Sequence, residues 1–259
     1  MSTGGKVRKR IAADGVVCSQ HGPVSRRQIA PGVLLGCGAC IEAAYVEQAA
    51  FEAHAVVEGR YLDAGLPLGF FGVGFDNFEC RVPEQHAALG DVRRFVGRYP
   101  AGGNLVLAGP AIGKTHLLVA SLKHLAARGS MVRYMNAIDM IHQLSVAGVR
   151  DEASESQVMR SLVGPTLLAI DHVGDVPWSE YRRRQFIRVI DARSSHGLPT
   201  SIATHTNVAQ LRRDIGERSL RRLLAYGDEL VTFDQEIHRF AGPLRGTAEF
   251  DQYLNPSKE

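Results

Sequence analysis

The sequence predicts an α/β protein in which a parallel sheet is flanked by helices and preceded by a small N-terminal module. From residue 104 onward, short apolar segments alternate with segments of helical periodicity, an order typical of a parallel sheet covered on both faces. Two of the short segments, NLVLA at 104–108 and TLLAID at 166–171, are almost uninterrupted apolar runs, as expected of buried strands. Three of the four cysteines lie before residue 41, ahead of this alternation.

The first 82 residues are predicted to contain one helix and one connector. Residues 41–63 are rich in Ala and Glu and place apolar residues at helical spacing, so we predict a helix there. The Gly-rich, aromatic stretch at 65–78 predicts an irregular connector. We therefore divide the chain into an N-terminal module at 1–64, a connector at 65–82 and an α/β domain at 83–259.

The α/β domain opens with a helix in the segment 82–99, which has Pro83 near its start. The strands that we predict after it are 104–108, 131–136, 166–171, 199–205 and 228–233. The helices that we predict between and after these strands are 114–129, 137–149, 156–164, 179–197, 207–216 and 217–227.

The composition is ordinary for a globular chain, with 45% hydrophobic and 22% charged residues among 259. The net charge of +3 permits contact with nucleic acid without requiring it, and each arginine cluster also suits a solvated helix face. No apolar run approaches the roughly 18 residues of a membrane span, and the basic N-terminus lacks the apolar segment of a signal peptide. We therefore expect a cytoplasmic protein without a membrane partner, whose cysteines bind metal or stay as thiols.

The segment 104–118, NLVLAGPAIGKTHLL, runs from an apolar strand through a loop of small residues into a helix. Such a loop directs backbone N–H groups at phosphates, a lysine reaches the outer phosphates, and a Ser or Thr hydroxyl holds Mg²⁺. Lys114 and Thr115 meet these needs. The loop departs from the usual spacing either because one residue is missing after Gly109, or because Ala108 and Ala111 stand where glycines are usual. Either way some freedom to adopt positive φ is lost, at about 1 kcal/mol per strained residue. The alternative, a chance Gly-Lys-Thr in a surface turn, is disfavoured by the flanking strand and helix. The candidate nucleotide-binding residues in this loop are Gly109, Pro110, Ala111, Ile112, Gly113, Lys114, Thr115 and His116.

Asp171 ends a second apolar strand, where a carboxylate orders Mg²⁺ in proteins with such a loop. The next position usually carries an acid that orients and deprotonates the attacking water, and here it is His172. A neutral imidazole accepts a proton but brings no negative charge, so we expect slow hydrolysis. Asp175 is close enough in sequence to act as a substitute acid, and an ordinary loop role for His172 stays open.

Cys18, His21, Cys37 and Cys40 form a C-x-x-H pair and a C-x-x-C pair separated by 15 residues. Two such pairs converge tetrahedrally on Zn²⁺, and four protein ligands make the site structural because no coordination position stays open. The alternative is a set of unlinked thiols. Cys80 lies apart from this set, and we expect it to be an ordinary thiol.

Taken together, these segments resemble the DnaC-type replicative helicase loaders, which are AAA+ ATPases (P-loop NTPases) related to IstB-type transposition helpers and the initiator DnaA. The resemblance covers residues 65–239 and rests on NLVLAGPAIGKTHLLVASL, TLLAIDHVGDVPWSEY, LPTSIATHTNVAQL, GERSLRRL and FDQEIHR in this order. Loaders of this type also carry a zinc-knuckle element followed by an aromatic connector, here GLPLGFFGVGFDNF, which shapes the adenine side of the pocket.

The resemblance implies ATP, Mg²⁺ and Zn²⁺ as cofactors. It makes Lys114 and Thr115 ligands of the nucleotide and of magnesium, and it makes Asp171 the Walker B acid. His205 falls where the family has a sensor Asn, with Asn207 as the alternative. Arg218 and Arg222 resemble the arginine-finger pair that reaches a neighbouring subunit's ATP, which implies a homo-oligomer, although both also suit an exposed helix face. Arg239 resembles the sensor-2 arginine that completes the pocket within one subunit.

In this family the segment at 137–163 carries an extra helical element that touches single-stranded DNA. Arg150 and Arg160 are the candidate contacts, and a solvated helix face is the alternative for both. The implied function is an ATP-dependent loader that places a replicative DNA helicase on single-stranded DNA in a bacterium or a phage. A transposition helper of the IstB type is the second interpretation. A nucleotide-gated adaptor with little hydrolysis is the third, because the loop, His172 and His205 all depart from the family pattern.

Overall fold

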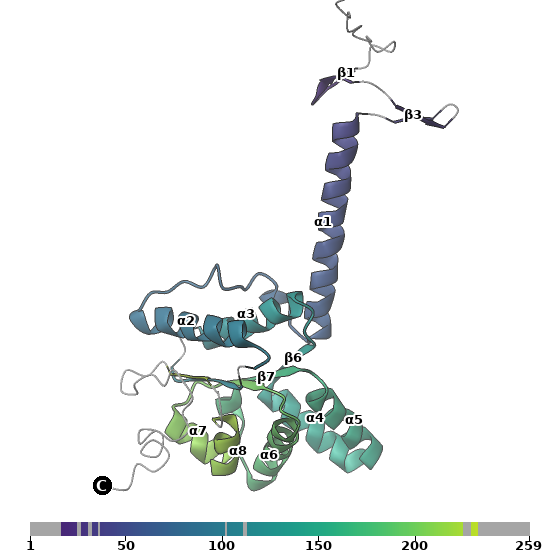
Figure 1. Cartoon of the computed structure of the whole chain (residues 1–259). Helices are drawn as coiled ribbons and strands as arrows, with labels where there is room; N and C mark the ends of the chain where they lie inside the picture. The colour runs from purple at the N-terminus through teal and green to yellow at the C-terminus, as the bar shows by residue number, and fades with distance from the viewer. Residues whose placement is uncertain are drawn as a thin grey trace, which may run out of the picture. The chain divides into compact units, whose positions relative to one another are not determined.

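The computed structural model describes residues 17–24, 27–30, 33–35, 37–101, 103–110, 113–224 and 229–232. The chain divides into two compact units, residues 1–56 and 57–259, which are described separately here (Figure 1). None of the helices in the described segments combines the length and apolarity that a membrane crossing needs.

The first unit holds two short antiparallel hairpins and the start of a long helix. The hairpins pair β1 (Val17–Cys18) with β2 (Gly22–Pro23) and β3 (Arg27–Ala30) with β4 (Val33–Leu35). Gly22 has a φ of 72°, a left-handed conformation that glycine adopts without steric cost. The helix α1 (Gly38–Asp63) begins in this unit and confirms the helix predicted at 41–63. The hairpins were not predicted because strands of two to four residues show no periodicity.

The second unit is built on a five-stranded parallel sheet in the order β6-β7-β8-β5-β9. The strands are β5 (Leu105–Ala108), β6 (Val132–Asn136), β7 (Leu167–Asp171), β8 (Thr200–Ala203) and β9 (Glu229–Thr232). The predicted parallel sheet is confirmed, and every strand predicted for it is present. Because the strands are parallel, their carboxyl ends meet along one edge of the sheet, and Asn136 pairs in register with Asp171 there.

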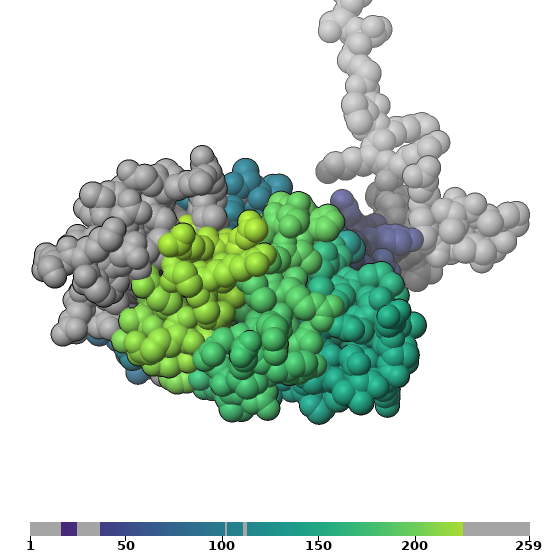
Figure 2. Space-filling model, turned by 90° about the horizontal axis from the view of Figure 1, so that it is seen from below, coloured from purple at the N-terminus to yellow at the C-terminus, as the bar shows by residue number. Residues whose placement is uncertain are grey.

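Helices cover both faces of this sheet (Figure 1). On one face lie α2 (Pro83–Arg98) and α3 (Lys114–Ala127). On the other lie α4 (Ala137–Arg150), α5 (Glu152–Val163), α6 (Glu180–Ser195), α7 (Val208–Ile215) and α8 (Glu217–Leu223). Figure 2 views this second layer from outside, with α7 and α8 in yellow-green, α6 in green, and α4 and α5 in teal. Two 3₁₀ turns, η1 (Leu68–Phe70) and η2 (Val173–Asp175), complete the described elements.

The two helical layers explain why the strands are apolar on both sides. Along β5, Leu105 and Leu107 pack toward α2 and α3, whereas Val106 and Ala108 pack toward the other layer. The aromatic connector adds Phe70, Phe71, Phe75 and Phe78 to the α2–α3 side. A strand buried on both faces cannot alternate between apolar and polar residues, which is why β5 reads as one apolar run.

The helix predicted at 156–164 begins earlier than the sequence suggested. It starts at Glu152, because the Asp151 side chain accepts a hydrogen bond from the Ser154 backbone N–H and caps the helix. The prediction was wrong at this end because residues 152–155 are Glu, Ala, Ser and Glu, which show no apolar periodicity.

Candidate functional site

A cavity of about 190 Å³ opens at the carboxyl ends of the strands in the second unit. Its lining comes from the start of α3, the end of β7 and the end of β8. The lining residues are Gly113, Lys114, Thr115, Asp171, His172, Ala203, Thr204 and His205. Six of these eight were candidates from the sequence, so the fold gathers residues that are more than 90 positions apart in the chain.

The loop before α3 is closed by glycines in left-handed conformations at both ends. Gly109 has a φ of 114° and Gly113 a φ of 99°, which side chains rarely adopt. The Gly109 N–H donates to the Thr206 carbonyl oxygen at 2.9 Å, which ties the loop to the segment after β8. Pro110 is described, whereas Ala111 and Ile112 lie outside the described residues.

Gly113 also lies against the aromatic connector. A Cβ at this position would lie 2.5 Å from the Phe78 ring, so the ring and the loop pack as closely as a glycine allows. His116, a sequence candidate, does not line the cavity. Its Nε2 lies 2.7 Å from the Gly74 carbonyl oxygen, and its ring contacts Phe78 edge to face. His116 therefore holds the connector in place beside the loop.

Lys114 is the first residue of α3 and is only 7% exposed. Burial lowers the pKa of Lys114 to about 8, and the nearby Asp171 carboxylate partly opposes this shift. Its Nζ donates to the Pro110 carbonyl oxygen at 2.5 Å. A cation held at a helix N-terminus, inside a cavity and beside glycines, is a favourable setting for a phosphate group.

Asp171, at the end of β7, is 2% exposed and accepts two hydrogen bonds. The Tyr134 hydroxyl donates to Oδ2 at 3.1 Å, and the His172 backbone N–H donates to Oδ1 at 2.8 Å. Burial, followed by the charge of Asp171, raises the pKa of Tyr134, so the phenol keeps its proton and remains a donor. These contacts fix the carboxylate of Asp171 at the edge of the cavity.

His172 has a left-handed backbone (φ 59°, ψ 35°) and is the sole non-glycine residue with positive φ in the described part of the chain. A residue with a Cβ adopts this conformation at a cost of about 1–2 kcal/mol, and such strain clusters at functional sites. The reversal starts the η2 turn, in which the Asp175 N–H donates to the His172 carbonyl oxygen at 3.0 Å.

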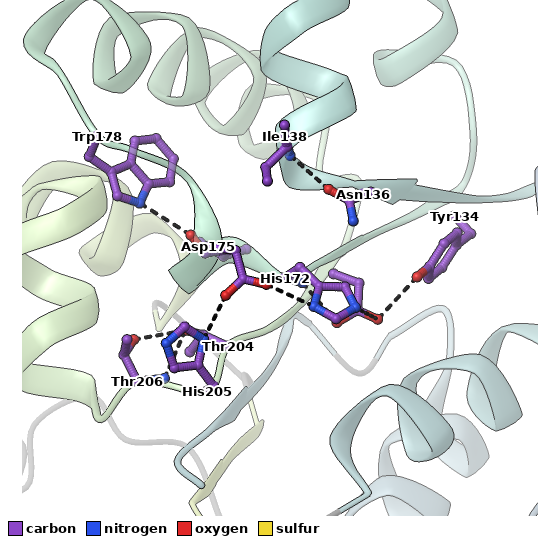
Figure 3. A network of polar contacts seen from close by, with 11 residues as sticks. Tyr134, Asn136, Ile138, His172, Asp175, Trp178, Thr204, His205 and Thr206 are labelled. Carbon is purple, nitrogen blue, oxygen red and sulfur yellow. Dashed lines mark hydrogen bonds and ion pairs between the residues drawn. The ribbon is translucent and has the colours of Figure 1, made fainter. Parts of the chain in front are cut away.

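Asp175 contacts both histidines of the site (Figure 3). Its Oδ2 lies 3.1 Å from Nδ1 of His172, and its Oδ1 lies 3.0 Å from Nδ1 of His205. The other ring nitrogen of His172, Nε2, lies 3.6 Å from Oδ2 of Asp171. Asp175 itself does not line the cavity, so it stands behind the two rings.

Thr204 is a cavity residue that the sequence did not single out. It is 1% exposed, and its Oγ1 accepts from the Thr206 N–H at 3.2 Å and lies 2.7 Å from Thr206 Oγ1. Its N–H donates to the Leu107 carbonyl oxygen at 2.9 Å. The signal in the sequence was a threonine at the tip of an apolar strand, where the carboxyl ends of parallel strands gather.

The arginine-finger candidates lie away from the cavity. Arg218 and Arg222 are on α8, and both pair with Asp191 of α6: Arg218 Nη2 is 2.5 Å from Oδ2, and Arg222 Nε is 3.2 Å from Oδ1. The Arg218 side chain is largely exposed and that of Arg222 is about half exposed. Arg239 lies outside the described residues.

The DNA-contact candidates Arg150 and Arg160 also lie apart from the cavity. Arg150 ends α4 and Arg160 is in the last turns of α5, and both are exposed. Their exposure suits the solvated-face interpretation as well as a contact with a phosphate backbone.

The four metal-ligand candidates of the first unit converge, and their ligand atoms all lie within 4.8 Å of one another. His21 Nδ1 is 3.6 Å from Cys18 Sγ and 3.3 Å from Cys40 Sγ, and the two sulfurs are 3.4 Å apart. Ligand atoms around one tetrahedral Zn²⁺ are about 3.5–3.8 Å apart, so the set fits that ion closely. A hydrogen bond from the backbone of Gln20, with the His21 contact second, lowers the pKa of Cys18 to about 6, which favours a metal-binding thiolate.

Part of the chain is similar in sequence to a protein family and to individual proteins. Residues 96–223 match the family described as IstB-like ATP binding protein. The chain is 27% identical over 167 residues to the replicative helicase loader DnaC of Escherichia coli (strain K12), across 64% of this chain and 68% of that protein. It is 25% identical over 167 residues to the uncharacterized protein YdaV of the same organism, across 64% and 67% of the two chains.

Solved structures share the fold of the second unit. The DnaC helicase loader aligns with a TM-score of 0.57 at 21% identity, across 65% of this chain and 100% of that one. DnaA from Aquifex aeolicus, bound to AMPPCP, aligns with a TM-score of 0.55 at 20% identity, across 62% and 50%. The AAA+ fold expected from the sequence is therefore confirmed.

Proposed function

We propose that this protein is a nucleotide-dependent loader of a replicative DNA helicase, since residues 96–223 match the family described as IstB-like ATP binding protein. The match to a DnaC loader over 64% of the chain carries the proposal. The cavity that gathers Lys114, Asp171 and the two histidines supports it, since a loader that responds to ATP needs a phosphate site of this kind.

The residues at the cavity fit a nucleotide with magnesium. Gly113 and the first turn of α3 direct backbone N–H groups toward a bound phosphate, and Lys114 supplies the cation. Thr115 and Asp171 line the same cavity and offer the hydroxyl and carboxylate oxygens that Mg²⁺ prefers. When bound, the ion neutralises charge on the phosphates. Phe78 and the connector lie beside the loop and form the adenine side.

We assign hydrolysis, at a low rate, to His172 and His205. His172 accepts the proton of the attacking water, and it lacks the negative charge that the usual acid brings. His205 takes the place of the sensor that contacts the terminal phosphate. Both rings line the cavity, so both reach a nucleotide held by Lys114.

Arg218 and Arg222 act in trans on the nucleotide of a neighbouring copy in an assembled oligomer. Both are exposed on α8 and neither lines the cavity of its own chain, which suits that role. An arginine supplied by a neighbour stabilises charge in the transition state and makes hydrolysis depend on assembly. Arg239 is assigned the sensor-2 role by family resemblance.

The first unit is a module that zinc stabilises and that binds the helicase. Cys18, His21, Cys37 and Cys40 fill four positions of a tetrahedral site, so the ion stabilises the fold and leaves no position for a substrate. Among the described side chains of this unit none is a buried apolar one, and a metal compensates for such a lack of core. Single-stranded DNA binds along the α4–α5 segment through Arg150 and Arg160.

A transposition helper is the second candidate function, because the matching family is described as IstB-like. An adaptor that binds ATP and hardly hydrolyses it is the third candidate. It is favoured because His172 stands where the family has an acid and His205 stands where it has a sensor Asn. The adaptor is compatible with helicase loading, because a switch requires only that ATP bind one conformation better than another.

The decisive experiment is a pull-down of the replicative helicase encoded in the same genome, with and without ATP. The loader proposal predicts a stable complex whose composition changes with ATP, and Lys114→Ala abolishes the response to ATP while retaining helicase binding. Absence of a complex in both conditions refutes the loader. Stimulation of a transposase encoded beside this gene then establishes the helper. The adaptor is excluded if the wild type turns over ATP above background and Lys114→Ala removes this turnover.

A further inference from the structure

Asp175 is the one carboxylate that touches both histidines of the cavity, and its two oxygens are divided between them. Oδ2 contacts Nδ1 of His172 at 3.1 Å, and Oδ1 contacts Nδ1 of His205 at 3.0 Å (Figure 3). The histidines follow β7 and β8, which are neighbours in the sheet. A single side chain thus links the ends of two strands on the border of the cavity.

The backbone around Asp175 is built to hold this contact. Val173 is fully buried, and its carbonyl oxygen accepts from the Trp178 indole N–H at 3.1 Å. Gly174 brings the turn close to the second histidine, because a Cβ there would lie 2.8 Å from Cε1 and 2.9 Å from Nδ1 of His205. The close approach of Gly174 and the anchored turn hold Asp175 beside the His205 ring.

A carboxylate imposes a specific protonation pattern on both rings. An ionised Asp has acceptors only, so each imidazole that contacts it must present an N–H, and the contact atom is Nδ1 in both rings. In a neutral His205 ring the other nitrogen, Nε2, is then the acceptor. The His172 ring lies between two carboxylates, because its Nε2 is 3.6 Å from Oδ2 of Asp171. Without Asp175, the His205 ring is free to rotate or to carry its proton on Nε2, and the His172 ring keeps only its contact with Asp171.

From this geometry we infer that Asp175 is a positioning residue, which sets the orientation and the tautomer of both His172 and His205 at the proposed nucleotide site. The inference rests on the proposed function of the cavity. Asp175 does not replace the missing acid directly, because it does not line the cavity. It acts through the rings, and it couples the residue that faces the attacking water to the residue that senses the terminal phosphate.

The side chain of Asp175 is 43% exposed and its partners are 45% and 52% exposed. Ion pairs at this exposure contribute little to stability, so removing the carboxylate leaves the fold intact. Asp175→Ala removes both acceptors. Asp175→Asn leaves one acceptor oxygen and adds an NH₂ donor. It therefore satisfies one Nδ1–H and forces the other ring to change its tautomer or its orientation. Glu180→Gln is the matched control, since the Glu180 side chain is 80% exposed at the start of α6, pairs with Arg184 and does not line the cavity.

The test combines ¹⁵N–¹H spectra of the histidine rings, recorded without nucleotide, with ATP affinity and turnover. We expect Nδ1–H rings at His172 and His205 in the wild type, a changed tautomer for at least one ring in Asp175→Asn, and changes for both in Asp175→Ala. Turnover falls at least about tenfold in Asp175→Ala while ATP affinity changes less than about threefold, because misplaced catalytic groups lower the rate rather than the affinity. Glu180→Gln matches the wild type in every measurement.

A rescue experiment separates positioning from a general structural effect. The double variant His172→Glu with His205→Asn carries the acid and the amide that the family usually has. It has no imidazole ring for Asp175 to orient, so adding Asp175→Ala to it changes turnover less than about twofold. Unchanged ring tautomers in both Asp175 variants refute the inference. It is also refuted if Asp175→Ala lowers turnover as much in the double variant as it does in the wild type. If the wild type shows no turnover, the proposed hydrolysis fails, and the ring spectra still decide the role of Asp175.

Discussion

Gly174→Ala is the substitution that most directly tests how the cavity is held together. The added Cβ would lie 2.8 Å from Cε1 of His205, 2.9 Å from its Nδ1 and 2.8 Å from Oγ1 of Thr204. Ordinary contacts begin near 3.4 Å, so these atoms must retreat by about 0.6 Å to restore normal van der Waals distances. Thr204 is almost completely buried at the end of β8 and has little room to move. The half-exposed ring of His205 therefore yields.

A shift of that size breaks the contact between His205 and Asp175. The crowded atom Nδ1 is the one that lies 3.0 Å from Asp175 Oδ1, and a retreat of about 0.5 Å lengthens this pair to about 3.5 Å, beyond the usual range of an N–H···O hydrogen bond. Overpacking typically costs about 1–3 kcal/mol, and an exposed ring that can swing outward places this variant near 1 kcal/mol. Turnover should fall about 10- to 100-fold, because catalysis is sensitive to misplacement on this scale.

The assays are urea unfolding, ATP affinity and phosphate release, each compared with Gly90→Ala. Gly90 lies in α2 with open space around it, so alanine there should stabilise the protein by about 0.5–1 kcal/mol and leave turnover unchanged. Wild-type turnover in Gly174→Ala, together with an unshifted His205 ring signal, would refute the reasoning. A loss of ATP affinity as large as the loss of turnover would also refute it, because the phosphate loop should be untouched.

Three further predictions concern the phosphate site, the metal site and the core. Burial lowers the pKa of Lys114 to about 8, and a bound phosphate requires the charged form, so ATP affinity measured by titration should fall as the pH rises through 8. A flat profile from pH 7 to 9.5 would contradict this. The purified chain should contain about one equivalent of zinc by elemental analysis, and Cys40→Ser should lower that content and the melting temperature of the first unit; a folded, metal-free wild type would exclude the site. Arg193 is fully buried and donates to the carbonyl oxygens of Leu162, Pro165 and Pro199 and to Thr200 Oγ1. Arg193→Lys should therefore cost about 2–4 kcal/mol in urea unfolding, because lysine cannot donate in the same fork and leaves buried acceptors unsatisfied; a loss below about 0.5 kcal/mol would show that the carbonyl groups find other partners.

Much of the candidate site could be predicted because its signals are local. Lys114 and Thr115 follow a strand and open a helix, and Asp171 ends an apolar run, so each carries its context within a dozen residues. The cysteine and histidine pairs can likewise be recognised from their spacing, and the structure brings their ligand atoms within 4.8 Å of one another. The beginning of α5 could not be predicted, because its first turn depends on the Asp151 cap rather than on apolar periodicity.

By itself, then, the sequence determined the α/β class, the strands and the residue types at the phosphate loop, since these follow from periodicity and from motifs of a few residues. Only the tertiary structure decided which distant residues meet. Asp175 reaches His205, thirty positions further along the chain, because β7 and β8 are adjacent in the sheet. Arg218 and Arg222 share Asp191 because α6 packs against α8, and Arg193 is buried whereas Arg184 and Arg188 of the same helix are exposed. Such pairings depend on strand order and helix packing, which sum weak preferences over the whole chain and leave no trace in any short segment.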